Sequence, residues 1–144
     1  MMIVRQLSVF LENKPGRLCA ATDTLAKKGI NISALTLADT AEFGILRMIV
    51  DQPDLAKDVL TESGVIVRIS EVIAVAMDDT PGGAGGILHL LSEGGISVEY
   101  MYACVGRLSG KALMVIRTDD PVKATDILHN AGYGEINPAE VYRI

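Results

Sequence analysis

Residues 13–33 read Asn-Lys-Pro-Gly-Arg-Leu-Cys-Ala-Ala-Thr-Asp-Thr-Leu-Ala-Lys-Lys-Gly-Ile-Asn-Ile-Ser. A Pro-Gly turn opens this stretch, apolar residues at helical spacing follow, and a glycine then leads into a β-branched run. The pattern returns at residues 79–99, which read Asp-Thr-Pro-Gly-Gly-Ala-Gly-Gly-Ile-Leu-His-Leu-Leu-Ser-Glu-Gly-Gly-Ile-Ser-Val-Glu. Pro15 and Pro81 are 66 residues apart, and a glycine, a leucine and a Gly-Ile pair behind each proline keep this spacing. The chain is therefore an internal duplication, and its function has to account for two copies.

Each copy carries the signals of four strands and two helices in the order β-α-β-β-α-β. In the first copy we predict strands over residues 3–11, 30–37, 45–50 and 65–69, and helices over 17–28 and 53–62. In the second copy we predict strands over 72–77, 96–101, 112–117 and 140–144, and helices over 83–93 and 121–130, the last capped by Asp120. The order predicts an α+β fold of two ferredoxin-like units, 1–70 and 71–144, each an antiparallel sheet with both helices on one face. Since each half alone is small enough to be marginally stable, we expect the units to pack as an intrachain pseudo-dimer.

The junction between the copies leaves two arrangements open. Only Ser70 and Glu71 separate the strand at 65–69 from the strand at 72–77. A hairpin there would place 65–69 in the second unit and leave its position in the first unit to 140–144, which would be a strand exchange. The alternative is one nearly continuous strand that passes between the units. Pairing of 65–69 with 7–11 would exclude the exchange.

Composition narrows the classes of function. The 144 residues carry 13 basic and 18 acidic side chains, for a net charge of −5, and no basic cluster, which argues against nucleic acid and anionic membranes as partners. The two cysteines and two histidines are isolated, so we expect no disulfide, metal site, cofactor or catalytic group. The N-terminus lacks the features of a signal peptide, and no apolar run reaches the roughly 18 residues of a spanning helix. We therefore expect a cytoplasmic protein.

The repeated motif resembles the ACT domain family of small-molecule-binding regulatory modules. The first copy carries the resemblance at Asn13, Pro15, Gly16, Leu18, Leu25, Gly29, Ile30, Asn31 and Ile32. The second carries it at Asp79, Pro81, Gly82, Ala84, Leu91, Gly95, Ile96, Ser97 and Val98. The resemblance covers essentially the whole chain, as a tandem pair without a catalytic domain. It implies units side by side through their second strands, with an amino acid or similar effector between the Pro-Gly loop of one unit and the second strand of its neighbour.

The chemistry of the loops agrees with such a ligand. Backbone N–H groups at a helix start attract a carboxylate, while Asn13, Asp78 or Asp79 can hold an ammonium group. Asn31 and Ser97 open the second strands and can hydrogen-bond across the unit interface. We predict no catalytic and no metal-binding residues. The predicted ligand-binding residues are Asn13, Pro15, Gly16, Arg17, Leu18, Asn31, Ile32, Ser33, Asp79, Pro81, Gly82, Gly83, Ala84, Ser97 and Val98.

The two loops differ in bulk. Arg17 and Leu18 in the first copy correspond to Gly83 and Ala84 in the second, where more glycines follow. Glycine weakens a helix start but lets a ligand approach the backbone closely. We therefore predict that the second loop forms the better site, completed by residues 31–33.

These features favour a non-catalytic module that binds an amino acid or related metabolite, works as a homodimer and regulates an enzyme allosterically. The alternatives are a structural or dimerisation module that regulates a partner enzyme without a ligand, and a small enzyme on a ferredoxin-like scaffold. Tyr100 and Tyr102 share one face of a predicted strand, where they either line the unit interface or cover a ligand.

Overall fold

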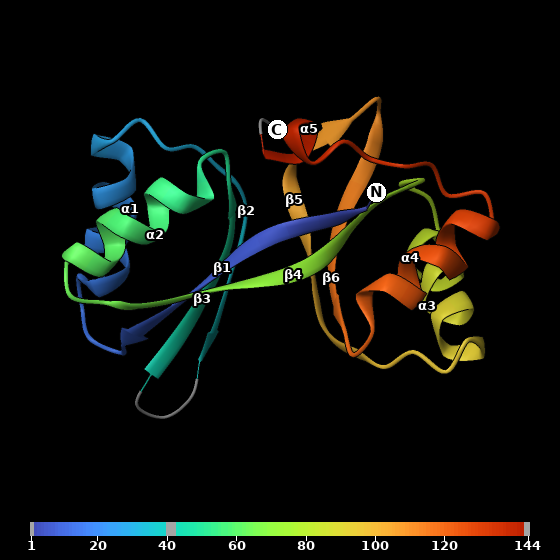
Figure 1. Cartoon of the computed structure of the whole chain (residues 1–144), viewed down its shortest axis with the longest axis horizontal. Coiled ribbons are helices and arrows are strands. Elements are labelled where there is room, and N and C mark those ends of the chain that lie inside the picture. The colour runs from blue at the N-terminus through green and yellow to red at the C-terminus, as the bar shows by residue number, and fades with distance from the viewer. Residues whose placement is uncertain (1, 40–42, 143–144) are drawn as a thin grey trace.

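The computed structural model describes residues 2–39 and 43–142, and strands alternate with helices along both halves (Figure 1). The strands are β1 Ile3–Glu12, β2 Ile32–Asp39, β3 Phe43–Val50, β4 Ile66–Met77, β5 Val98–Leu108 and β6 Lys111–Thr118. The helices are α1 Arg17–Lys27, α2 Pro53–Glu62, α3 Gly83–Glu93, α4 Pro121–Asn130 and α5 Pro138–Tyr142. The predicted cap of α4 is confirmed, because Asp120 Oδ1 accepts a hydrogen bond from the Lys123 amide at 3.0 Å.

The six strands form one closed antiparallel barrel in the order β1-β3-β2-β5-β6-β4. The α+β composition agrees with the prediction. Two separate four-stranded sheets are not formed, because β1 and β4 each belong to both halves of the barrel. β1 begins in the second half and ends in the first, and β4 begins in the first half and ends in the second, so each half includes part of both strands.

β4 is one continuous strand across the predicted unit boundary. Its first part pairs with β1, where Val67 lies opposite Val9, and its second part pairs with β6, where Val75 lies opposite Met114. Of the two arrangements left open, the exchange of residues 65–69 is therefore excluded, and the continuous strand is confirmed. The physical reason lies in Ser70 and Glu71, neither of which favours the positive φ of a two-residue hairpin turn, so the strand runs straight on.

The second half fills its fourth-strand position with the start of the chain. Ile3 and Val4 of β1 lie opposite Ile73 and Val72 of β4, and the Ala74 amide donates to the Met2 carbonyl at 2.8 Å. The predicted strand over 140–144 is wrong for its described part, since α5 occupies this region; residues 143–144 lie outside the described residues.

The sequence before α5 explains why this segment is helical. Asn137 Oδ1 accepts a hydrogen bond from the Ala139 amide at 3.0 Å, and the helix begins at Pro138. An asparagine cap followed by a proline in the first helical position is a strong helix-start signal. This signal overrides the apolar residues behind it, which the sequence analysis assigned to a strand.

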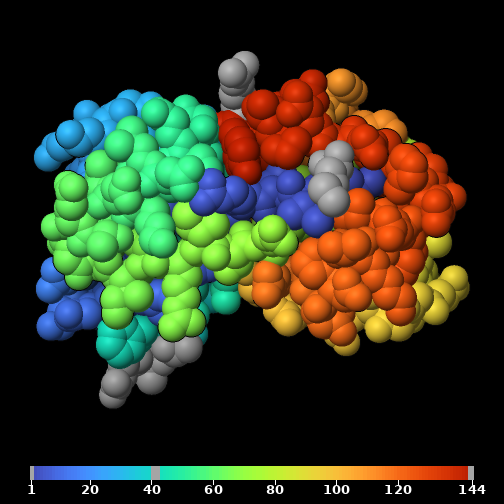
Figure 2. Space-filling view, viewed as in Figure 1, coloured from blue at the N-terminus to red at the C-terminus, as the bar shows by residue number. Residues whose placement is uncertain are grey.

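Three cores hold the molecule together. α1 and α2 cover the sheet of the first half, and α3 and α4 cover that of the second, so the helices lie at opposite ends of the molecule (Figure 1). The space-filling view shows these ends as two lobes with β1 and β4 between them (Figure 2). The third core fills the barrel with side chains from both halves, among them Val4, Ala34, Val72 and Val115, and with Ile136 and Val141 from the α5 region.

The halves meet side by side at their second strands, as the family resemblance implied. β2 and β5 are antiparallel neighbours, and Ala34 opposite Cys104 is their paired position. The β2–β5 pair has far fewer paired residues than the other strand pairs, so contacts between side chains have to provide much of the interaction between the halves here.

Candidate functional site

The two Pro-Gly loops have almost the same backbone geometry. Gly16 and Gly82 precede α1 and α3 with φ of 85° in both, a left-handed conformation that glycine adopts without strain. The Arg17 amide donates to Lys14 and the Gly83 amide to Thr80, which closes each turn. These two amides are therefore already bonded. The next amides of each helix are the ones that lack an intrahelical acceptor, as at every helix start.

The first loop borders a small pocket of about 140 Å³. Asn13 Nδ2 lies 3.5 Å from Asp39 Oδ2 across it. Glu12 forms ion pairs with Lys14 at 3.0 Å and Arg17 at 3.9 Å, and the hydrogen bond from Lys14 lowers the pKa of Glu12. The lining residues are Leu11, Glu12, Asn13, Lys14, Leu18, Leu37, Asp39 and Gly44. The charges of this loop are thus paired with one another around a narrow space.

The second loop borders a pocket of about 290 Å³, twice the volume of the first. The lining residues are Ala76, Met77, Asp78, Thr80, Pro81, Gly82, Gly83, Gly86, Lys111 and Tyr133. Lys111 Nζ lies 3.4 Å from Asp78 Oδ1 at the entrance, and both side chains are more than half exposed. The pocket therefore presents both signs of charge beside a loop of small residues.

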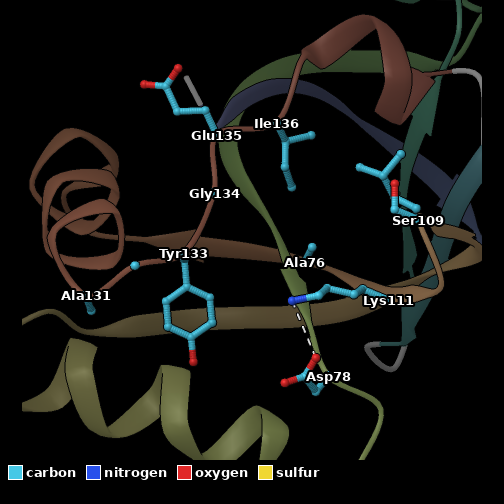
Figure 3. Close-up of a pocket in the computed structure, with 11 residues that line it drawn as sticks. Ala76, Asp78, Ser109, Lys111, Ala131, Tyr133, Gly134, Glu135 and Ile136 are labelled. Carbon is cyan, nitrogen blue, oxygen red and sulfur yellow. Dashed lines mark ion pairs between the residues drawn. The ribbon is translucent and has the colours of Figure 1, made fainter.

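A second space of about 480 Å³ adjoins this pocket and shares Ala76, Asp78, Lys111 and Tyr133 with it (Figure 3). The segment between α4 and α5 forms its far wall, and Tyr133 points toward α3. A Cβ added at Gly86 would lie 3.4 Å from the Tyr133 hydroxyl, an ordinary contact distance, so the end of the Tyr133 side chain lies next to α3 at this position. Together the two spaces form one polar groove along the second half.

The predicted acidic residues of the second loop already have cationic partners. Asp79 Oδ2 accepts a hydrogen bond from Arg107 Nη2 at 2.5 Å, while Asp78 pairs with Lys111. Since each of these ion pairs is exposed, each contributes little, on the order of 0–1 kcal/mol, and an incoming charged ligand can open it.

The predicted strand residues do not line the second-loop pocket. The Asn31 amide donates to Asp51 and the Ser97 amide donates to Asp119, both at 3.0 Å, so the two copies use these positions in the same way. Ser33 is fully buried and donates to the Ile49 carbonyl at 3.2 Å. Ile32 and Val98 pack against the two helical cores. The structure thus gives all of these positions structural contacts.

The remaining predicted residues lie around the loops. Pro15 is exposed, and Arg17 lines a further space of about 280 Å³ between α1 and the start of β4. Ala84 is half-buried in the first turn of α3.

Sequence reasoning missed Lys111, Arg107 and Tyr133. Lys111 and Arg107 flank the β5–β6 turn, where Ser109 and Gly110 both have positive φ. Pro53 and Pro121 are 68 residues apart, two more than the other repeats, so an insertion in this turn was the available signal. For Tyr133 no sequence signal existed, because the position of its side chain depends on how the segment between α4 and α5 crosses the second half.

Tyr100 and Tyr102 line the contact between the halves. Tyr102 donates to Gln6 Oε1 at 2.7 Å, and Gln6 Nε2 donates to the Tyr100 hydroxyl at 2.7 Å. Gln6 is fully buried, and burial raises the pKa of Tyr102. Of the two alternatives for these tyrosines, the structure supports the unit interface.

Among residues 2–39 and 43–142 there is no group of three or more side chains suited to hold a metal ion. Cys19 is exposed and Cys104 is buried in the barrel core. No helix in the described part of the chain is long and apolar enough to span a membrane.

A family model described as an ACT domain pair matches residues 2–139. Protein BT0572 from Bacteroides thetaiotaomicron is 38% identical in sequence with a TM-score of 0.92, and the match covers 99% of this chain and 98% of that chain. The ligand-free regulatory subunit of aspartate kinase from Thermus thermophilus is 15% identical with a TM-score of 0.65, over 89% of this chain and 92% of that chain. Aspartate kinase from Synechocystis is 19% identical with a TM-score of 0.60, over 94% of this chain but 28% of that chain. The two aspartate kinase likenesses concern the fold alone. No curated protein matches the chain.

Proposed function

Because the chain belongs to the ACT domain pair family, we propose that it is a regulatory module that binds an amino acid or a related small metabolite at its Pro-Gly loops. In this proposal the protein is not an enzyme, works in the cytoplasm as a homodimer, and changes the activity of a partner enzyme when the effector binds. Its halves act as an intrachain pseudo-dimer of ferredoxin-like units, with the unit boundary inside β4.

The observation that carries the proposal is the polar groove at the second loop. A free amino acid brings a carboxylate and an ammonium group on one small molecule. Lys111 offers a cation for the carboxylate, together with the unbonded amides at the start of α3, and Asp78 offers an anion for the ammonium group. The volume of about 290 Å³, with about 480 Å³ adjoining it, is of the size of a small-molecule site.

The first loop is the weaker site in this proposal. Its own pocket has half the volume, and the space of about 280 Å³ that adjoins it at Leu11 and Glu12 is smaller than the space of about 480 Å³ beside the second loop. The side chains of Glu12, Lys14 and Arg17 also satisfy one another. Residues 31–33, Ser97 and Val98 stay candidate contacts of the ligand sites, although the structure gives them structural roles.

Calorimetric titration and a thermal-shift screen with the twenty amino acids test the proposal, because a ligand that binds only the folded state raises its stability. We expect Lys111→Met to weaken binding of the stabilising amino acid by roughly tenfold or more, as a hydrogen bond to a charged group is lost. Lys14→Met is the matched control, since it removes the same charge from the first loop, and it should leave the affinity unchanged.

Three results would count against this proposal. Equal losses in the Lys111→Met and Lys14→Met variants would contradict the preference for the second loop, and no loss in either variant would place the ligand elsewhere. No stabilisation by any amino acid or close metabolite would favour the module that regulates a partner without a ligand.

A further inference from the structure

The barrel has two chemically different ends. α5 lies over one end (Figure 1), where Ile136 and Val141 complete the apolar core. Along β1, the barrel-facing side chains change from Val4 to Gln6 and then to Ser8 with distance from this end. The barrel interior therefore becomes polar toward its other end.

Four polar side chains form one row across the strands at that end. Ser8 of β1 lies opposite Arg47 of β3 on one side and opposite Arg68 of β4 on the other, and Thr36 of β2 lies opposite Arg47. Residues in register across neighbouring strands project from the same face of the sheet. We call Arg68, Ser8, Arg47 and Thr36 the arginine row. None of them lines the pockets of the Pro-Gly loops.

The two arginines of the row differ from the other arginines that the structure describes. Arg5, Arg17, Arg107 and Arg117 each form an ion pair with a carboxylate. Within residues 2–39 and 43–142, Arg47 and Arg68 form none. Each lies instead over an aromatic ring: Arg47 is 3.9 Å from the ring centre of Tyr100, and Arg68 is 5.7 Å from that of Phe10. Contact with a ring uses the flat face of the guanidinium group and leaves its in-plane N–H donors available.

One of these donors is buried without an acceptor. Arg47 Nε is inaccessible to solvent and has no hydrogen-bond partner in the described part of the chain. Buried donors without partners are rare in folded proteins because they are costly, and an unoccupied ligand position is one physical reason for them. An acceptor on a bound ligand would satisfy this donor.

Ser8 lies between the two arginines and can add a further donor. Its Oγ accepts a hydrogen bond from Gln6 Nε2 at 3.3 Å, so its own hydrogen is free to bind an anion. Arg47 and Arg68 belong to strands on either side of β1, so their backbones are about 9–10 Å apart, and their long side chains can meet over Ser8.

From this geometry we propose that the arginine row binds a small dianion, either a phosphate monoester or a dicarboxylate. Arg47 and Arg68 supply two positive charges and planar pairs of donors, which suit phosphate and carboxylate groups alike. The hydroxyl groups of Ser8 and Thr36 supply neutral donors. Because Arg47 also lies on Tyr100 of β5, a bound dianion fixes a contact between the two halves of the molecule.

Titration with inorganic phosphate and with succinate, at matched ionic strength in chloride, tests the site and distinguishes the two ligand classes. We expect one of the dianions to raise the unfolding temperature in a saturable way. Arg68→Gln and Arg47→Gln should each weaken that binding by roughly tenfold or more. Arg5→Gln removes the same charge from an exposed arginine that lines none of the pockets and already has a carboxylate partner in Asp54, so its affinity should match that of the unsubstituted protein.

The proposal is overturned if neither dianion stabilises the protein, or if Arg5→Gln weakens binding as much as Arg68→Gln does. Arg68 is exposed, so its variant decides the question even if Arg47→Gln folds poorly. The site is independent of the loops: amino-acid binding should persist in Arg68→Gln, and dianion binding should persist in Lys111→Met.

Discussion

Replacing glycine by alanine should have opposite effects on stability at Gly83 and at Gly85, both in the first turn of α3. A Cβ at Gly83 would collide with the backbone carbonyl oxygen of Asp78, whereas a Cβ at Gly85 would meet open space. We expect Gly83→Ala to destabilise the fold by roughly 1–3 kcal/mol, because the loop has to shift. Gly85→Ala should stabilise it by about 0.5–1 kcal/mol through helix propensity. Urea unfolding of both variants measures the difference, and equal effects would show that the turn is not tightly closed.

Because the Cys104 thiol is buried, we expect the protein to lose stability at alkaline pH. Burial raises the pKa of this thiol to about 11, above its ordinary value of 9.0. Below pH 9 the thiol keeps its proton in both the folded and the unfolded chain, and the buried thiol makes its full contribution to stability. Between these two pKa values the unfolded chain releases the proton more readily, so stability falls as pH rises. Thermal unfolding from pH 8 to pH 11 should show this decline in the unsubstituted protein and a shallower one in Cys104→Ala; identical slopes would contradict the assignment.

At the scale of the elements, a single capping residue, Asn137, determines that the segment of α5 is a helix. Asn137→Ala removes the hydrogen bond to the Ala139 amide, and replacing such a cap costs about 0.5–2 kcal/mol. Because Val141 of this helix is fully buried in the barrel core, the loss should appear in the global unfolding midpoint. Asn130→Ala, at the exposed end of α4, is the matched control and should change stability by less than about 0.5 kcal/mol. A midpoint that stays the same in Asn137→Ala would mean that α5 does not close the barrel.

The elements also show what the sequence could and could not predict. The helices α1 to α4 and the Pro-Gly loops were predicted well, because proline, glycine and helical spacing act through neighbouring residues. The partners of β1 were not predictable in the same way. An alternating apolar pattern identifies a strand, but it does not say that Ile3 and Val4 pair in the second half of the molecule. The same limit applies to the site: the loops were found, whereas Lys111 and Tyr133 reach the groove through tertiary contacts.

At the scale of the whole molecule, β1 and β4 cross both halves and the barrel core draws side chains from each, so the halves should unfold as one cooperative unit. All four tyrosines, at positions 100, 102, 133 and 142, lie in the second half. Tyrosine fluorescence therefore reports on that half and on its contact with the first half, where Tyr100 and Tyr102 bond Gln6, while far-UV circular dichroism reports on helices from both halves.

This asymmetry allows a direct test with Leu25 of α1, which is fully buried in the core of the first half. Leu25→Ala should cost about 2–5 kcal/mol, as for other large-to-small changes in a core. If the halves are coupled, the tyrosine-detected midpoint in urea should fall as far as the midpoint detected by circular dichroism, although no tyrosine lies near the substitution in sequence. Leu91→Ala, at the equivalent buried position of α3, is the control in the other half and should move both signals together. A tyrosine transition that stays in place in Leu25→Ala would mean that each half folds by itself, and the shared strands would then be a joint between two domains rather than the centre of one.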